Sequence, residues 1–125
     1  MTDSLRDQLP KSNDWHWPSV EAIRSLGGSG TNDEINSEVS TRMGFSEEMQ
    51  SLLHGDGPAT EVAYRTAWAR TYLKGMGLAN NSQRGVWTLT PLGNEVEEDD
   101  LPELRNAYLR EMREAREKRG DVGVD

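Results

Sequence analysis

The sequence predicts a mainly α-helical protein with a small β-hairpin and a charged C-terminal helix. Three observations lead to this prediction. Apolar residues recur at helical spacing in successive segments as far as Gly77. Two short strand-like runs then flank the turn sequence NSQRG, which spans residues 81–85. Beyond residue 97 charged residues dominate, and only a narrow apolar stripe remains.

The composition indicates a protein of the cell interior. Of the 125 residues, 34% are hydrophobic and 29% are charged, and cysteine is absent, so no disulfide or thiolate zinc site is expected. No apolar run is long enough to cross a membrane, and the N-terminus lacks the pattern of a signal peptide. The two histidines, His16 and His54, do not have a metal-ligand spacing. We expect a cytoplasmic protein without membrane contact, metal or cofactor.

The first half of the chain predicts three helices after a flexible N-terminal arm over residues 1–14. The first helix opens around Pro18 and stops at Gly27, and Trp15 and Trp17 are expected to cover the core at its entry. The second helix starts with a capping box, in which Thr31 is followed three residues later by Glu34. A short third helix from Ser46 is expected to turn three apolar residues inward: Met49, Leu52 and Leu53.

The clearest helix follows Thr60, a residue suited to cap it, and ends at Gly75 or Gly77. Steps of about 100° per residue divide it into two sides. The inward side is expected to hold Trp68, Ala69, Tyr72, Leu73 and Met76. The outward side is expected to hold Thr60, Ala63, Ala67, Arg70, Thr71 and Lys74, with Tyr64 at its edge.

A hairpin is predicted next, with strands at Leu78–Asn80 and Val86–Thr90. Gly85 suits the positive φ of its turn, and Trp87 and Leu89 are expected to pack the hairpin on the helices, because an isolated hairpin is barely stable. The last helix spans about residues 97–119 and ends at Gly120, before a disordered tail over 120–125. Its apolar stripe suits either dimerisation or a solvated linker helix, and both readings stay open: Leu101, Leu104, Tyr108 and Met112.

The charge of the chain is unevenly distributed. The formal net charge is −8, yet residues 60–96 hold four basic and two acidic residues, a net charge of +2. Surface charges are screened over about 8–10 Å, so a local basic surface can persist on an acidic protein. Together with the order helix, helix, helix, hairpin, this pattern favours a winged helix-turn-helix over residues 15–96.

Two segments of the sequence resemble a known protein family. WARTYLKGMGL from Trp68 and RGVWTLTPLG from Arg84 resemble the N-terminal domain of Mrr-type restriction endonucleases, with the patterns W-A-R-x-Y-L-x-x-x-G-L and R-G-x-W-x-[IL]-T-x-x-G. The resemblance extends from Trp17 to Val96 and is specific in its second half. It implies a winged-helix domain that delivers a separate nuclease domain to double-stranded DNA in a restriction system. Tyr64 and Thr66 depart from the residues common beside Arg65 in the family, so an inherited base preference does not follow.

The helix after Thr60 would then enter the major groove, and the hairpin would act as the wing. The expected DNA-binding residues are Thr60, Ala63, Tyr64, Ala67, Arg70, Thr71, Lys74, Gln83 and Arg84. Arg65 matches an arginine of the family pattern but falls on the inward side, where we expect it to pair with an acidic residue.

The sequence offers no catalytic site. The acidic run EVEEDD, residues 95–100, has no lysine in a strand beside it, as a restriction-type nuclease would require, and GGSGTNDE lacks the lysine of a phosphate-binding loop. We expect a non-enzymatic module whose nuclease, if one exists, acts as another subunit or domain. The alternative is a protein–protein interaction or dimerisation module, because a fold alone does not decide function.

Overall fold

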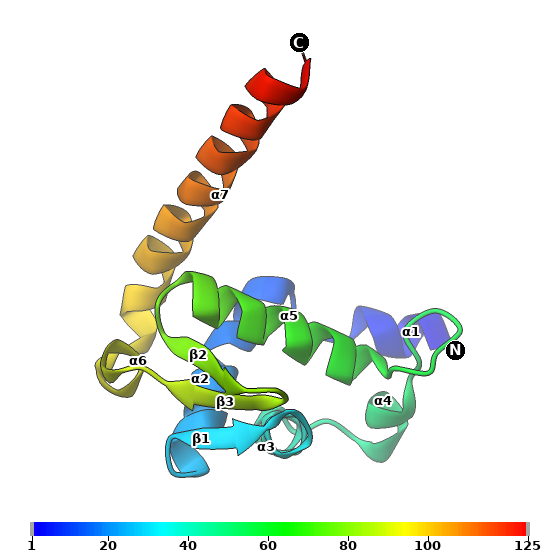
Figure 1. The fold of residues 1–125 in the computed structure, drawn as a ribbon. Helices are drawn as coiled ribbons and strands as arrows, with labels where there is room; N and C mark the ends of the chain where they lie inside the picture. Colours follow the sequence, from blue (N-terminus) through cyan, green and yellow to red (C-terminus); the bar gives the residue numbers. More distant parts are fainter. Residues whose placement is uncertain (1, 125) are drawn as a thin grey trace.

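A computed structural model describes the backbone of residues 2–124 and the side chains of residues 5–119. Figure 1 shows helices packed on one small sheet, with the last helix extending away from them. The elements are α1 (Thr2–Asp7), η1 (Ser12–Trp15), α2 (His16–Ser25), β1 (Ser29–Thr31), α3 (Asn32–Met43), α4 (Glu47–Ser51), α5 (Glu61–Gly75), β2 (Ala79–Gln83), β3 (Val86–Leu89), α6 (Pro91–Glu95), η2 (Glu98–Asp100) and α7 (Leu101–Val124). A mainly α-helical fold with a small hairpin and a C-terminal helix is therefore confirmed.

The sheet is antiparallel and has the strand order β1–β3–β2. The sequence did not predict β1, which pairs with β3 through Gly30 and Trp87. This strand has the sequence Ser-Gly-Thr, whose side chains carry almost no apolar signal, so the sequence alone does not mark it as a strand. The predicted hairpin is present, and its register shifts by an irregularity between Asn80 and Gln83.

The core lies where α2, α3 and α5 meet the sheet. Eight of its apolar residues are fully inaccessible to solvent: Val20, Ala22, Ile23, Ile35, Val39, Leu73, Leu78 and Ala79. The capping box at Thr31 forms as predicted, with Glu34 N donating to Thr31 Oγ1 at 3.1 Å and Thr31 N donating to the Glu34 carboxylate at 2.9 Å. Trp15 is buried, Trp17 is half-buried, and Leu89 and Trp87 join the hairpin to this core, all as expected.

The N-terminal residues are packed rather than forming the flexible arm that was expected. Residues 2–7 form α1, and Leu9 is buried in the core cluster. Trp15 Nε1 donates to Pro10 O at 3.0 Å, and Arg6 pairs with Glu61 of α5 at 3.1 Å. The segment is held by contacts with α5, which lies far along the chain. Such contacts leave no helical periodicity in the sequence, and the packing was therefore not predicted.

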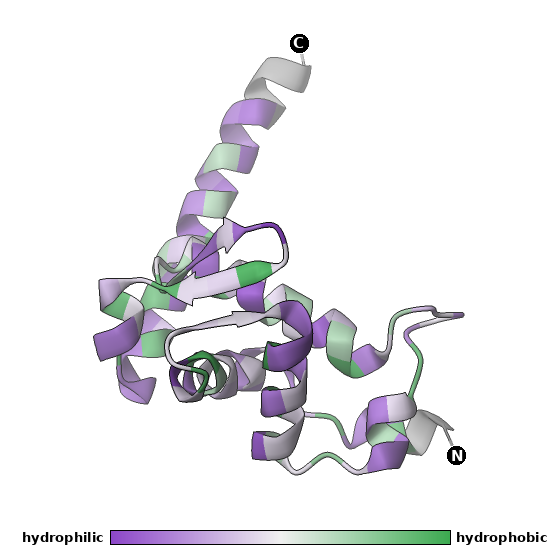
Figure 2. Ribbon diagram, turned by 60° about the horizontal axis from the view of Figure 1, so that its bottom comes forward, coloured by the Kyte–Doolittle hydropathy of each residue, from purple (hydrophilic) through white to green (hydrophobic). Residues whose placement is uncertain are grey.

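Helix α7 begins on the domain and then leaves it. Leu101 is buried, and Leu104 and Tyr108 pack against the core. These three residues are therefore not free to form the dimer contact that was one of the two expectations for this stripe. Tyr108 covers Gly75, where an added Cβ would lie 2.1 Å from Tyr108 Cε1. Of the predicted stripe, only Met112 is exposed. It lies on the part of α7 that projects from the domain in Figure 1, and Figure 2 shows that the residues of this part are mainly hydrophilic.

The end of α7 also differs from the prediction. The helix continues past Gly120 to Val124, where a disordered tail was expected, and residue 125 lies outside the described residues. Leu53, predicted to face inward, is exposed because the chain turns away from the core directly after α4, leaving Leu52 as the buried residue.

Candidate nucleic-acid interface

Helix α5 is positioned by a cap at its start and by a buried face of small and medium-sized residues. Thr60 Oγ1 accepts from Ala63 N at 3.1 Å, which satisfies one free backbone donor of the first turn. The buried face includes Val62, Thr66 and Leu73. Thr66 can be buried at little cost because its hydroxyl donates to Val62 O at 2.8 Å. The opposite face of α5 is thereby left to solvent.

Eight of the nine predicted DNA-binding residues are accessible. Tyr64, Thr71, Lys74, Gln83 and Arg84 are exposed, and Thr60, Ala63 and Ala67 are half-buried. Six of them lie on α5 or its cap, and the other two lie at the tip of the hairpin. Helix α5 packs against β2 of the hairpin, so these eight residues lie on two neighbouring elements, which Figure 1 shows side by side.

The placement of Arg70 on this face was wrong. Arg70 is 5% exposed, and its Nη1 donates to Asn36 Oδ1 of α3 at 2.9 Å. Its guanidinium lies 5.9 Å from the ring centroid of Trp87. Burial lowers the pKa of Arg70, and nearby Asp33 acts in the opposite direction. Arg70 therefore joins α5, α3 and the hairpin, and it does not present its charge to a ligand.

Trp68 shows the complementary error. It was expected in the core, but it is 53% exposed, because the buried face of α5 is rotated towards Arg70. Trp68 and Tyr64 line a shallow hollow of about 280 Å³ on the outer face of α5, together with Ala67 and Thr71. The sequence signal that could have found Trp68 is its spacing of four residues from Tyr64, which places both rings on one face of a helix.

The hairpin tip is fastened to the start of α3. Asn32 N donates to Gly85 O, and Trp87 Nε1 donates to Asn32 Oδ1, both at 3.0 Å. Asn81 Nδ2 donates to Gln83 O and to Val86 O, which fixes the turn across the irregular register. Gly85 has a φ of 75°, as the turn requires. The side chains of Gln83 and Arg84 project from a tip that is itself held in place.

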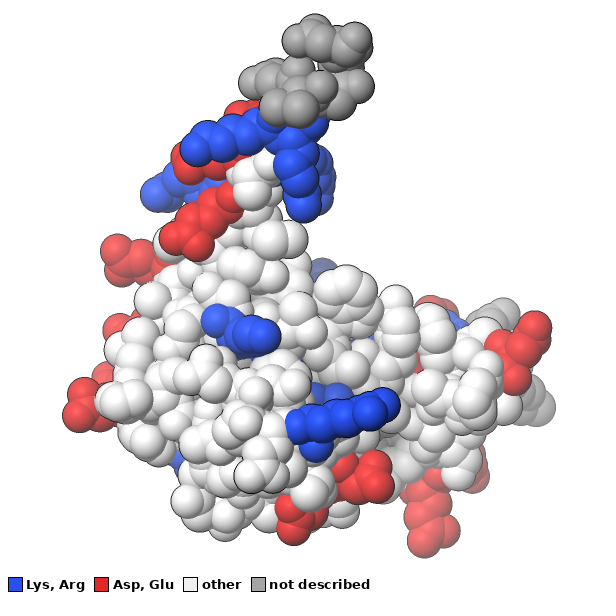
Figure 3. Space-filling view, viewed as in Figure 1, with Lys and Arg blue, Asp and Glu red and all other residues white. Residues whose placement is uncertain are grey.

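The charge on this side of the molecule is sparse and positive. Figure 3 shows isolated basic side chains on a largely uncharged surface over α5 and the hairpin, with acidic side chains along its edges. Lys74 and Arg84 are exposed, and within the described part of the chain neither takes part in an ion pair. Both cations are therefore available to an anionic partner.

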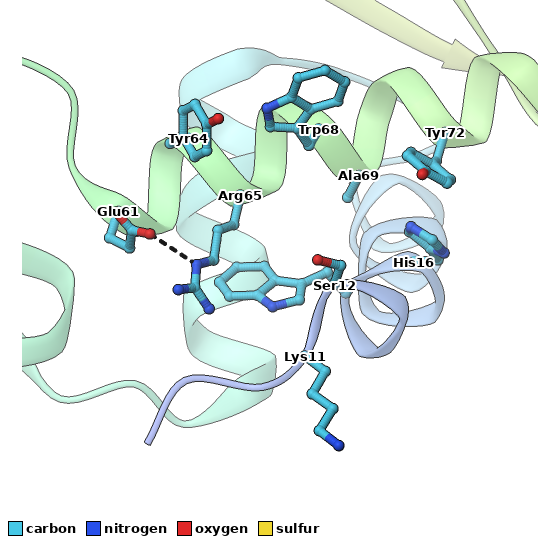
Figure 4. A pocket seen from close by; sticks show the side chains of 10 residues that line it. Lys11, Ser12, His16, Glu61, Tyr64, Arg65, Trp68, Ala69 and Tyr72 are labelled. Atoms are coloured by element: carbon cyan, nitrogen blue, oxygen red, sulfur yellow. Dashed lines mark hydrogen bonds and ion pairs between the residues drawn. The ribbon is translucent and has the colours of Figure 1, made fainter. Parts of the chain in front are cut away.

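Glu61 holds three basic side chains together at the start of α5, a role that the sequence did not predict. Its carboxylate is buried, and it binds Arg6 at 3.1 Å, His54 Nδ1 at 2.8 Å and Arg65 Nε at 3.0 Å. Burial acts to raise the pKa of Glu61, but the hydrogen bonds from His54 and Arg65 prevail and lower it. The expectation that Arg65 pairs with an acidic residue is confirmed by this contact, which is drawn in Figure 4.

Within the described residues, no group of three or more potential ligands could hold a metal ion. In the same part of the chain, none of the helices combines the length and apolar character required to cross a membrane.

The fold and the accessible site define a small helical domain that presents one helix and one hairpin on the same side. The Mrr N-terminal domain matches residues 13–99, well over half of the chain, so the chain belongs to this family. The match includes α2 to α6 and therefore the whole of the accessible site. No curated protein and no solved structure matches this chain.

Proposed function

We propose that the chain binds double-stranded DNA as a winged helix-turn-helix, with α5 in the major groove and the β2–β3 hairpin as the wing. The order α2, β1, α3, α5, β2, β3 supports this assignment, since a helix-turn-helix places its second helix in the groove and the first across the backbone. The short helix α4 lies in the connection between α3 and α5.

The observation that carries the proposal is that exposed basic side chains over α5 and over the hairpin lie on one face of the molecule, as Figure 3 shows. Ala63 and Ala67 leave the backbone of α5 open to close approach, and Thr71 adds a hydroxyl that can bond a base edge or a phosphate. Lys74 and Arg84 supply the cations for phosphates at two separate points. Arg70 has no part in this interface.

The family indicates the biological setting. We propose that residues 15–96 are the DNA-recognition module of a Mrr-like restriction system in the cytoplasm, without catalytic activity of their own. The acidic residues at 97–100 lie before and within η2, next to helices and not on a sheet, which is unlike the carboxylate arrangement of a restriction-type nuclease. The nuclease would belong to a longer relative or to a separate subunit.

A second candidate function is association through α7. The part of α7 beyond Tyr108 projects from the domain and carries exposed Leu109 and Met112 among charged residues. This portion suits a linker helix to a nuclease, or a contact with a partner or a second copy. Replacing Leu109 and Met112 with lysine would leave the docked residues intact. If the mass of this variant in solution is lower than that of the parent, association through α7 is supported. An unchanged mass would rule out association through these two residues.

The DNA-binding proposal is tested by measuring duplex affinity across a salt series. Each phosphate contact contributes a slope of about −0.9 in log K against log salt. The variant K74A/R84A is expected to flatten the slope by about 1.8. The matched control R116A/K118A removes the same charge from the projecting part of α7 and is expected to keep the parent slope. An unchanged slope in K74A/R84A would refute the proposed interface.

A further inference from the structure

A second, larger cavity lies beside the proposed DNA face. It measures about 560 Å³ and is formed between α5 and the N-terminal segment that includes η1. This volume falls within the range of about 300–1,000 Å³ found for small-molecule sites. Five of its lining side chains carry rings: Trp15, His16, Tyr64, Trp68 and Tyr72. Figure 4 shows that Tyr64, Trp68 and Tyr72 come from α5, while His16, at the start of α2, stacks on Tyr72.

Two of these rings remain in water although they are largely apolar. Trp68 is the most exposed large hydrophobic residue of the described part, and Tyr64 is exposed beside it. Tyr64 stacks on His54, with ring centroids 3.6 Å apart and an angle of 10° between the planes, so its position is fixed. Exposed aromatic rings that line a cavity are suited to stack with a planar ligand.

Cationic side chains slightly outnumber carboxylates in the wall of the cavity, with Lys11 and Arg65 against Glu61. Arg65 lines it and donates from Nε to Glu61 and from Nη1 to Pro10 O at 3.3 Å. The Glu61 carboxylate also pairs with Arg6, so two guanidinium groups surround one carboxylate. Lys11 lies at the rim, with its side chain directed away from the rings in Figure 4. The lining residues therefore carry a net charge of +1, which is compatible with a phosphate near the rim.

The cavity adjoins the surface assigned to DNA. Tyr64 and Trp68 line both the cavity and the shallow hollow on the outer face of α5, where Ala67 and Thr71 complete the wall. A nucleotide displaced from a duplex that contacts α5 would meet these two rings first. Displacement costs less for a mismatched or already unpaired base than for a paired one.

We propose that this cavity receives one unpaired nucleobase of a DNA bound on α5, stacked on Trp68, with its phosphate near Arg65. This inference rests on the proposed function, because the duplex must first bind to the outer face of α5. It adds a preference for DNA that contains an unpaired nucleotide over fully paired DNA.

The test compares two duplexes that differ only by one bulged nucleotide. The parent protein is expected to bind the bulged duplex about tenfold more tightly, as one base stacked on an aromatic ring provides. W68A is expected to lose the preference and bind both duplexes equally, and W68F is expected to restore most of the preference. L92A, which shortens another exposed apolar side chain on α6, serves as the matched control and should behave like the parent.

The outcomes separate the two claims. Equal affinity of the parent for both duplexes would overturn the base site and leave duplex binding by α5 standing. A preference that survives in W68A would also overturn it, because the base would then bind elsewhere. Binding to neither duplex would refute the proposed function, and the base site with it. K74A/R84A should lower the affinity for both duplexes by the same factor. This result distinguishes loss of phosphate contacts from loss of stacking.

Discussion

Replacing Arg70 with alanine should destabilise the fold without changing how the folded protein responds to salt when it binds DNA. The side chain connects three elements, through a hydrogen bond of 2.9 Å to Asn36 on α3 and a cation–π contact at 5.9 Å with Trp87 on β3. Because Arg70 is 5% exposed, its removal also leaves a void beneath the hairpin.

The size of the effect follows from these contacts. A hydrogen bond from a charged donor contributes about 1.5–3 kcal/mol, and a cation–π contact contributes about 0.5–1 kcal/mol. Against this, Arg70 Nε has no hydrogen-bond partner among the described residues, and the buried charge is partly desolvated, which lowers the loss. We expect the free energy of unfolding to fall by about 2–3 kcal/mol in R70A, or about 10 °C in Tm.

The assay is urea unfolding followed by circular dichroism, combined with the salt dependence of duplex binding at a temperature where R70A is folded. R70M is the matched variant, because methionine fills the space without a buried charge and should cost about 1 kcal/mol or less. If R70A unfolds like the parent while its salt slope flattens by about 0.9, Arg70 contacts a phosphate and the buried placement is refuted.

Two further predictions concern the contacts between α7 and the domain. Alanine at Gly75 should destabilise the protein by about 1–3 kcal/mol, although alanine favours helices, because its Cβ would lie 2.1 Å from Tyr108 Cε1. The double variant G75A/Y108A should show the loss from Y108A alone in thermal unfolding, and a simple sum of both losses would contradict the clash. Burial, reinforced by Arg105, lowers the pKa of His16 from 6.5 to about 4. The unfolded chain therefore takes up this proton first as the pH falls, so stability should be full above pH 6.5 and decline on the order of 3 kcal/mol towards pH 4. Unfolding of H16Q across that range should be flatter, and a parent-like decline in H16Q would assign the effect to other groups.

The sequence predicted the elements well because their signals are local. The capping box at Thr31, the cap at Thr60 and the positive φ at Gly85 each depend on residues within a few positions, and all three occur in the structure. The family resemblance rested on two continuous segments and was likewise readable without tertiary information.

The rotation of α5 could not be predicted in the same way. A helical wheel assigns Trp68 to the core and Arg70 to solvent, which is the usual preference of each residue type. The structure reverses this because Asn36 and Trp87, from distant parts of the chain, provide partners for a buried guanidinium. The burial of Thr66 is likewise not evident from its polar residue type, because its hydroxyl donates a hydrogen bond to the backbone and the cost of burying it is thereby removed.

The N-terminal segment shows a similar limit. Its residues 1–14 have little periodicity, yet Arg6 reaches Glu61 on α5, and Leu9 joins the core. Residues Lys11 and Ser12 form part of the wall of the larger cavity. The candidate site on the outer face of α5 was therefore largely predictable, whereas the adjoining aromatic cavity depends on packing that no local pattern encodes.

Chemical-shift mapping of the ¹⁵N-labelled protein during titration with a short paired duplex tests the DNA-binding proposal most directly. We expect the largest amide shifts at Ala63, Ala67 and Thr71 on α5 and at Gln83 and Arg84 on the hairpin. Shifts confined to α7, or no shifts at any duplex concentration at low salt, would contradict it.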